Sequence, residues 1–246
     1  MTALRWCLAF GLISAPMTAL ACETMHYAQN KYTACRVDAA QDDIRLFLND
    51  PEDGRTLGTF GKIDRLLVQT GEALAFAMNA GMYHSDRRPV GHYVENGQEL
   101  APLITSDGPG NFGLLPNGVF CVSEGQARVI ETRRFDRERP TCRFATQSGP
   151  MLVIDGKLHP RFLENSDSTF IRNGVGTTSD GRTDWFVISE EPVNFNTFGS
   201  LFRDHLGTPQ ALYFDGNISR LYAPDLNRHD AGFPMGPIVG VVSSGN

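Results

Sequence analysis

The stretch that decides the fold runs from residue 185 to residue 214 and reads WFVISEEPVNFNTFGSLFRDHLGTPQALYF. Its two ends, residues 185–189 and 211–214, are short apolar runs of the kind found in buried central strands. If these two strands are parallel neighbours, the connection between them is right-handed and both strands end at the same edge of a sheet.

A helix is predicted between the two strands, over residues 196–205. Phe198, Leu201 and Phe202 fall on one helical stripe, and that stripe continues to His205 or Leu206. Gly207 follows as a stop signal. The whole stretch therefore predicts a strand, a helix and a second strand.

The rest of the chain is dominated by strand signals. Residues 62–70 form the one other helical segment, and Asp155-Gly156 is a good hairpin turn. Further strands are predicted over residues 44–48, 73–78, 119–122, 127–130 and 151–154. No internal repeat or break in composition divides the chain, so we predict a single strand-rich α+β domain with a mixed β-sheet and few helices.

Composition limits the partners of this domain. The chain has 246 residues, of which 41% are hydrophobic and 20% are charged, and its formal net charge is −6. This is enough apolar material for one folded domain and argues against disorder. Negative net charge and pI ≈ 5.5 argue against nucleic acid as a partner. The sequence gives no indication of an oligomeric state.

Residues 1–21 are predicted to be a signal peptide, and residues 22–246 the mature domain. Arg5 precedes an apolar run over residues 6–13, and Ala19-Leu20-Ala21 has the small-x-small pattern of a cleavage site. That run is too short to span a bilayer, and no transmembrane segment is predicted after it. We therefore expect a periplasmic or secreted protein, with a lipid anchor at Cys22 as the alternative.

Cysteine usage agrees with export. Removal of the signal peptide takes Cys7 away and leaves four cysteines, an even number in an oxidising compartment. Three pairings are open, and loop closure favours the two local ones, Cys22–Cys35 and Cys121–Cys142.

Polar groups recur where the predicted apolar strands end. Motifs of common hydrolases, nucleotide-binding loops and zinc sites are absent, and we predict neither a metal nor a cofactor. Such strand ends are places where a rigid sheet presents functional groups. They comprise Asn79, Gln147-Ser148-Gly149-Pro150, Arg172-Asn173-Gly174-Val175-Gly176, Ser189-Glu190 and Asp215-Gly216-Asn217-Ile218-Ser219.

These ordered motifs resemble the phosphodiester glycosidase family over residues 40–242. The resemblance rests on Met78-Asn79-Ala80-Gly81-Met82-Tyr83, on the motifs at 147–150 and 172–176, on residues 188–207, and on residues 211–222. It is closer to a bacterial exported branch than to the lysosomal members, which have more glycine at two of the motifs. The resemblance implies a hydrolase that cleaves a sugar-1-phosphodiester at the glycosidic C–O bond in an envelope or extracellular glycan.

The residue types suit that reaction. A phosphate monoester is a weakly basic leaving group, so strong acid assistance matters less than a carboxylate at the oxocarbenium-like centre and a cation for the phosphate. We predict Asp215 as nucleophile or base, Glu190 as the second carboxylate, and Arg172 as the phosphate ligand, opening a Gly-rich anion nest. The predicted substrate-binding residues are Asn79, Gly81, Gln147, Ser148, Gly149, Gly216, Asn217 and Ser219.

Structural roles are the alternatives at each position. Arg172 could pair with Glu190, and Asp215 could do no more than close a turn. At the level of the whole protein, the alternatives are a non-catalytic envelope protein that binds sugar phosphates or polysaccharide, and an enzyme that cleaves another phosphodiester at P–O.

Overall fold

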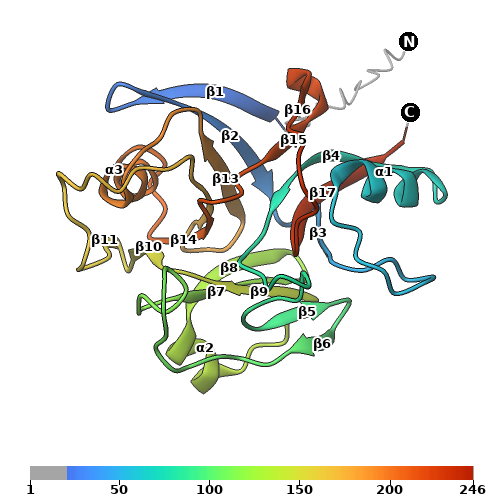
Figure 1. The fold of residues 1–246 in the computed structure, drawn as a ribbon, viewed down its shortest axis with the longest axis horizontal. Helices are drawn as coiled ribbons and strands as arrows, with labels where there is room; N and C mark the ends of the chain where they lie inside the picture. The colour runs from blue at the N-terminus through green and yellow to red at the C-terminus, as the bar shows by residue number, and fades with distance from the viewer. Residues whose placement is uncertain (1–20, 246) are drawn as a thin grey trace, which may run out of the picture.

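Three antiparallel sheets are arranged around a common centre (Figure 1). The computed structural model describes residues 21–245. The predicted signal peptide, residues 1–21, lies outside the described residues except for Ala21, the first residue of β1.

The first sheet has seven strands and the other two have five each. In spatial order, the first sheet consists of β1 (Ala21–Tyr27), β2 (Asn30–Asp38), β13 (Thr183–Ser189), β12 (Asn173–Thr177), β14 (Gln210–Asp215), β10 (Met151–Ile154) and β11 (Lys157–Leu158). The second consists of β16 (Arg228–His229), β15 (Leu221–Ala223), β4 (Glu72–Asn79), β17 (Ile238–Ser244) and β3 (Asp43–Phe47). The third consists of β6 (Gln98–Ala101), β5 (Tyr93–Glu95), β9 (Phe144–Ser148), β7 (Gly118–Ser123) and β8 (Gln126–Glu131).

The predicted class, a strand-rich α+β domain, is confirmed, but the sheets are antiparallel rather than mixed. Every pairing between named strands in the described residues is antiparallel. Strands β13 and β14 of the deciding stretch run in the same direction, yet they are not neighbours. Strand β12 lies between them and pairs with both, because it forms a hairpin with β13 before the helix returns the chain.

The main hydrophobic core lies where the three sheets meet. It contains fully buried aromatic side chains from each sheet, among them Phe76, Phe120 and Phe186. Phe186 packs against both of the other rings, with centroid separations of 5.3 and 5.6 Å. The central core thus fixes the sheets relative to one another, and through them the loops at their edges.

Each sheet carries one helix on its outer face (Figure 1). α1 (Phe60–Val68) packs on the second sheet, and α3 (Phe195–Ser200) on the first. α3 continues as a π-helix, η1 (Leu201–His205), so the helix predicted over 196–205 is present with a widened last turn. A short 3-10 turn, η2 (Pro224–Leu226), follows β15.

α2 (Thr132–Glu138), on the third sheet, was not predicted. Its sequence, TRRFDRE, is mostly charged, and only Thr132 and Phe135 are buried. So short an apolar stripe does not produce a recognisable helical period. The Glu131 side chain caps it by accepting the backbone N–H groups of Arg133 and Arg134.

Both predicted disulfides are present, Cys22–Cys35 and Cys121–Cys142. The first joins residues directly opposite each other on β1 and β2. Within residues 21–245, no helix is long and apolar enough to cross a membrane.

Candidate active site

Polar residues from all three sheets meet at one edge of the molecule. β4 ends at Asn79, β9 at Ser148 and β14 at Asp215. β12 runs antiparallel to β14, so its first residue, Asn173, lies beside Asp215. The structure therefore brings together three of the predicted site residues and adds Asn173, which belongs to a strand-end motif but has no predicted role of its own.

Asn79 and Asn173 form a buried amide pair between the second and first sheets. Asn79 Nδ2 donates to Asn173 Oδ1 over 3.2 Å, and Asn173 Nδ2 donates to the carbonyl and side-chain oxygens of Asn79 over 2.9 and 3.0 Å. Asn173 Oδ1 also accepts the Asp215 N–H at 3.2 Å, and Asn79 Oδ1 accepts the Arg220 N–H at 2.9 Å. The pair therefore holds both ends of the loop that follows β14.

Asp215 is a half-buried carboxylate without a cationic partner in the described part of the chain. Its Oδ1 accepts the N–H groups of Gly216 and Asn217 at 2.6 and 2.9 Å, so it does close a turn. Burial raises the pKa of this carboxyl, while the turn N–H groups lower it. A perturbed, unpaired carboxyl at the end of a rigid strand is a typical catalytic group.

Two predicted serines hold the backbone on either side of this carboxylate. Ser148 Oγ donates to the Phe214 carbonyl at 2.9 Å, and Ser219 Oγ donates to the Asp215 carbonyl at 2.7 Å. Their single protons are used in the framework, and their lone pairs remain as acceptors.

Gln147 lies at the same edge, but its side chain is directed into the third sheet. It is 2% exposed. Its Nε2 donates to the Ile104 carbonyl at 2.6 Å and its Oε1 accepts the His92 N–H at 3.0 Å. These bonds tie the loop before residue 105 to the sheet.

The predicted glycines serve close packing. A Cβ on Gly149 would lie 2.6 Å from Asn117 Cβ, and Gly81 has φ +152, a conformation open mainly to glycine. A Cβ on Gly216 would collide with the Tyr213 hydroxyl. Asn217 is exposed beside it.

Arg172 is fully buried, at 0% exposure. Its Nε donates to the Val193 carbonyl at 2.7 Å, and its guanidinium lies 3.7 Å from the Phe195 ring centroid. Burial lowers the pKa of this guanidinium, and the neighbouring Tyr213 raises it. Its Nη1 has no hydrogen-bond partner within the described residues. It does not pair with Glu190, the structural alternative named above.

The Gly-rich stretch after Arg172 is not an anion-binding loop. Residues Asn173–Thr177 form β12, which is buried along its whole length and paired on both sides. Its backbone groups are therefore committed to two ladders. Glycine is required for a different reason: a Cβ on Gly174 would lie 2.5 Å from the Leu212 carbonyl oxygen of β14.

Glu190 belongs to a separate polar group. Its Oε1 accepts from Thr33 Oγ1 at 2.6 Å and forms an ion pair with Arg228. Arg228 in turn pairs with Asp230 at 2.9 Å. Because β12 separates β13 from β14, the strands that precede Glu190 and Asp215 are about 10 Å apart. No interaction joins the two carboxylates in the described residues.

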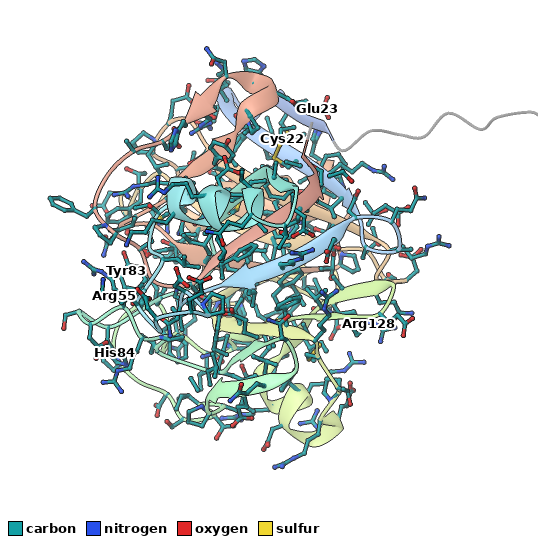
Figure 2. All side chains as sticks on the ribbon, turned by 90° about the vertical axis from the view of Figure 1, so that its right-hand side faces the viewer. Cys22, Glu23, Arg55, Tyr83, His84 and Arg128 are labelled. Atoms are coloured by element: carbon teal, nitrogen blue, oxygen red, sulfur yellow. A yellow bond between two sulfur atoms is a disulfide. The ribbon has the colours of Figure 1, made fainter. Side chains whose placement is uncertain are left out.

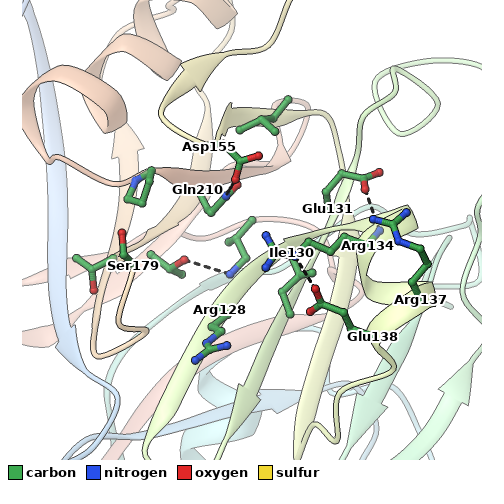
Figure 3. Close-up of a pocket in the computed structure, with 14 residues that line it drawn as sticks. Arg128, Ile130, Glu131, Arg134, Arg137, Glu138, Asp155, Ser179 and Gln210 are labelled. Carbon is green, nitrogen blue, oxygen red and sulfur yellow. Dashed lines mark hydrogen bonds and ion pairs between the residues drawn. The ribbon is translucent and has the colours of Figure 1, made fainter.

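A different hollow, of about 430 Å³, lies at the opposite end of β14, at Gln210 (Figure 3). Two of its lining pairs interact: Arg134 forms an ion pair with Glu138 at 2.7 Å, and the Gln210 amide donates to Asp155 at 2.5 Å. It contains none of the predicted site residues. Residues 21–245 also contain no group of three or more His, Cys, Asp or Glu placed to hold a metal ion.

Most of the three sheets and the polar edge lie in the part of the chain that matches a known protein family. Residues 72–242 match the phosphodiester glycosidase family, and the chain belongs to that family. It is also 39% identical over 170 residues to the uncharacterized protein YigE of Escherichia coli K12. That match covers 69% of this chain and 66% of YigE, so the chain spans just under two thirds of this relative.

Solved structures show the same fold at low identity. One is the catalytic domain of zebrafish N-acetylglucosamine-1-phosphodiester alpha-N-acetylglucosaminidase, auto-inhibited by its pro-peptide, with TM-score 0.62 and 9% identity over 90% of this chain and 81% of that one. Another is a candidate exported protein of Burkholderia pseudomallei K96243, with TM-score 0.57 and 11% identity over 86% and 74% of the two chains. Family and fold together support a hydrolase-type activity.

Proposed function

We propose that this protein is an exported hydrolase that cleaves a sugar-1-phosphodiester at the glycosidic C–O bond, with Asp215 as nucleophile or base. The observation that carries the proposal is the unpaired, half-buried Asp215 carboxylate, held by the Asn79–Asn173 pair in a member of the phosphodiester glycosidase family.

Asp215 would face the anomeric carbon as the bond to the phosphate oxygen breaks. As a nucleophile it forms a glycosyl ester that water then hydrolyses, and as a base it takes a proton from the attacking water. In both routes the bond electrons leave with the phosphate monoester, whose low basicity makes a strong general acid unnecessary. Gly216 lets the Tyr213 hydroxyl pack beside the carboxylate, where a Cβ would collide with it.

Glu190 and Arg172 keep supporting roles in this proposal. Glu190 would act as the second carboxylate at the rim, oriented by Arg228 and Thr33. Arg172, buried beneath the edge, would supply positive charge next to Tyr213 without contacting the anion. The two disulfides support export to an oxidising compartment.

The test is a panel of aryl sugar-1-phosphodiesters hydrolysed in oxygen-18 water by the wild type and by Asp215→Asn. Label in the released sugar indicates C–O cleavage, and turnover by the variant should fall about 10³-fold or more because the charge is lost with the shape kept. Since the carboxyl must be ionised and burial raises its pKa, the rate should rise with pH through a pKa above the ordinary aspartate value.

Asp225→Asn is the matched control, because Asp225 is exposed and lies on the 3-10 turn after β15. It should keep wild-type turnover. Label in the phosphate would indicate an enzyme that cleaves at P–O. Sugar-phosphate binding without turnover on any diester would favour the non-catalytic alternative.

A further inference from the structure

Tyr83 lies beside the candidate site, in the loop that follows β4. Figure 2 shows it close to His84 at one side of the molecule. Its ring packs against Gly236, where a Cβ would collide with it, and its backbone forms an isolated bridge with Pro89. The hydroxyl is buried and has no hydrogen-bond partner within residues 21–245.

Arg87 lies over this ring, with its guanidinium carbon 5.3 Å from the Tyr83 centroid. It forms no ion pair with any described residue, whereas its neighbour Arg88 pairs with Asp86 at 2.6 Å. Arg87 also has φ +73, which is uncommon for a residue other than glycine. The turn that holds it there is closed by its N–H, which donates to the His84 carbonyl at 2.8 Å.

Arg220 approaches from the loop after β14. Its N–H is held by Asn79, as described above, and its Nη1 donates to the Phe233 carbonyl at 2.6 Å. Its Nη2 packs so closely against Gly232 that a Cβ there would collide with it. The guanidinium is therefore fixed in place, yet it has no carboxylate partner in the described chain.

Hydrogen bonds hold Arg220 and Asp215 close together: Asn79 accepts the Arg220 N–H, and its partner Asn173 accepts the Asp215 N–H. Burial raises the pKa of the Tyr83 hydroxyl, and the charge of Asp215 raises it further. Arg87 and Arg220 act in the opposite direction on the same hydroxyl. Tyr83 therefore lies within electrostatic reach of the candidate catalytic carboxylate and of two arginines without ion-pair partners.

We propose that Arg87 and Arg220, arranged around Tyr83 next to Asp215, form the subsite for the phosphate of the diester. The inference rests on the proposed function and differs from the assignment of the phosphate to Arg172, whose guanidinium is not accessible. Two accessible cations would offset the repulsion between Asp215 and an anionic substrate. They would also stabilise the second negative charge that the leaving phosphate acquires.

The experiment measures the binding of inorganic phosphate by calorimetry to the wild type, Arg87→Gln, Arg220→Gln and Tyr83→Phe. Each arginine variant should weaken phosphate binding about tenfold or more, because a charge-assisted hydrogen bond is lost. Arg88→Gln is the matched control, being one residue away, exposed and paired with Asp86, and it should bind phosphate like the wild type.

Tyr83→Phe keeps the ring under Arg87 and removes a buried hydroxyl that has no partner in the described chain, so this variant should keep the melting temperature and the phosphate affinity of the wild type. Arg220→Lys covers the case in which Arg220→Gln unfolds, since it retains the charge and should bind phosphate better than Arg87→Gln. The subsite is wrong if Arg87→Gln and Arg220→Lys both bind phosphate as tightly as the wild type. It is also wrong if the wild type binds no phosphate at millimolar concentration.

Turnover of aryl sugar-1-phosphodiesters separates this inference from the proposed function. If the diesters are cleaved but Arg87→Gln and Arg220→Lys leave KM and kcat unchanged, the subsite is wrong and the function stands. If phosphate binding depends on both arginines but no diester is cleaved, the subsite stands and the function is wrong.

Discussion

Replacing Asn173 with alanine should reduce the free energy of unfolding by about 2–6 kcal/mol, a large fraction of the stability of a typical domain. The change removes the acceptor of the Asp215 N–H and the acceptor of Asn79 Nδ2. Both donors are left without these partners at a buried edge, and each buried donor without a partner costs about 1–3 kcal/mol.

A double-mutant cycle isolates the amide pair. Asn79→Ala, Asn173→Ala and the double variant should show a coupling of about 1–3 kcal/mol, because the two side chains share two hydrogen bonds. Asn217→Ala is the control, since its side chain is exposed, and it should change the unfolding free energy by less than about 0.5 kcal/mol.

Urea unfolding followed by Trp185 fluorescence measures these energies, because Trp185 lies on β13 of the same sheet. A loss of less than about 1 kcal/mol in Asn173→Ala, or an additive cycle, would refute the view that the pair joins the two sheets. Molecules of Asn173→Ala that remain folded should also lose turnover, since the Asp215 backbone is no longer held.

Three further changes test the framework. Asp184 is fully buried, and neither of its carboxylate oxygens has a hydrogen-bond partner in the described chain. Burial raises the pKa of this carboxyl, so the folded state keeps a proton that the unfolded state releases. Wild-type stability should therefore fall as pH rises above the ordinary aspartate pKa, and Asp184→Asn should remove this slope in urea midpoints measured from pH 4 to pH 8. Replacing both Cys121 and Cys142 with serine should reduce the free energy of unfolding by about 3.3 kcal/mol, the loop-closure entropy for a separation of 21 residues. An unchanged melting temperature would contradict this prediction. Gly174→Ala should lower the free energy of unfolding in urea by about 1–3 kcal/mol, because the added Cβ pushes β12 away from Leu212 of β14. An unchanged free energy of unfolding would mean that the two strands can separate without cost.

Local chemistry made much of the fold predictable. Asp155 and Gly156 both have positive φ and connect β10 to β11, as the hairpin signal predicts. Gly207, with φ +65, ends the helical segment at the predicted residue. These features depend on one or two residues and their immediate neighbours.

β12 could not be predicted, because glycine at two of its five positions is typical of a loop. Its glycines are explained only by the neighbours: a Cβ on Gly176 would lie 2.5 Å from both Phe202 and Thr208. Glycine lets β12 pack closely against its neighbours, but glycine also has a low strand propensity, so the local sequence does not indicate a strand.

The site was predictable in part for the same reason. Asn79 and Asp215 follow apolar strands, so their position at a sheet edge follows from local pattern. The pairing of Asn79 with Asn173 spans 94 residues, and that of Glu190 with Arg228 spans 38. No local pattern indicates such partners, and so the burial of Arg172 and the proposed role of Arg220 emerge only from the tertiary structure.

The order of strands in the second sheet has a consequence for how the chain reaches its native state. β17, which comes after every other strand in sequence, lies between β3 and β4 and pairs with both. Until residues 238–244 pair, β3 and β4 each have an unpaired edge on the side that β17 later occupies, and Asn79 lacks its β17 neighbour Ile238. Pairing over such a long separation is slow, because the loop must close before any contact compensates for its entropy.

A chain that emerges from a ribosome or a translocation channel in order would therefore form local hairpins such as β1–β2, β7–β8 and β12–β13 first and its candidate active site last. During that interval the two open edges are where non-native pairing with other chains is expected. Catalytic competence and the removal of the aggregation hazard should consequently appear in the same step, when β17 inserts.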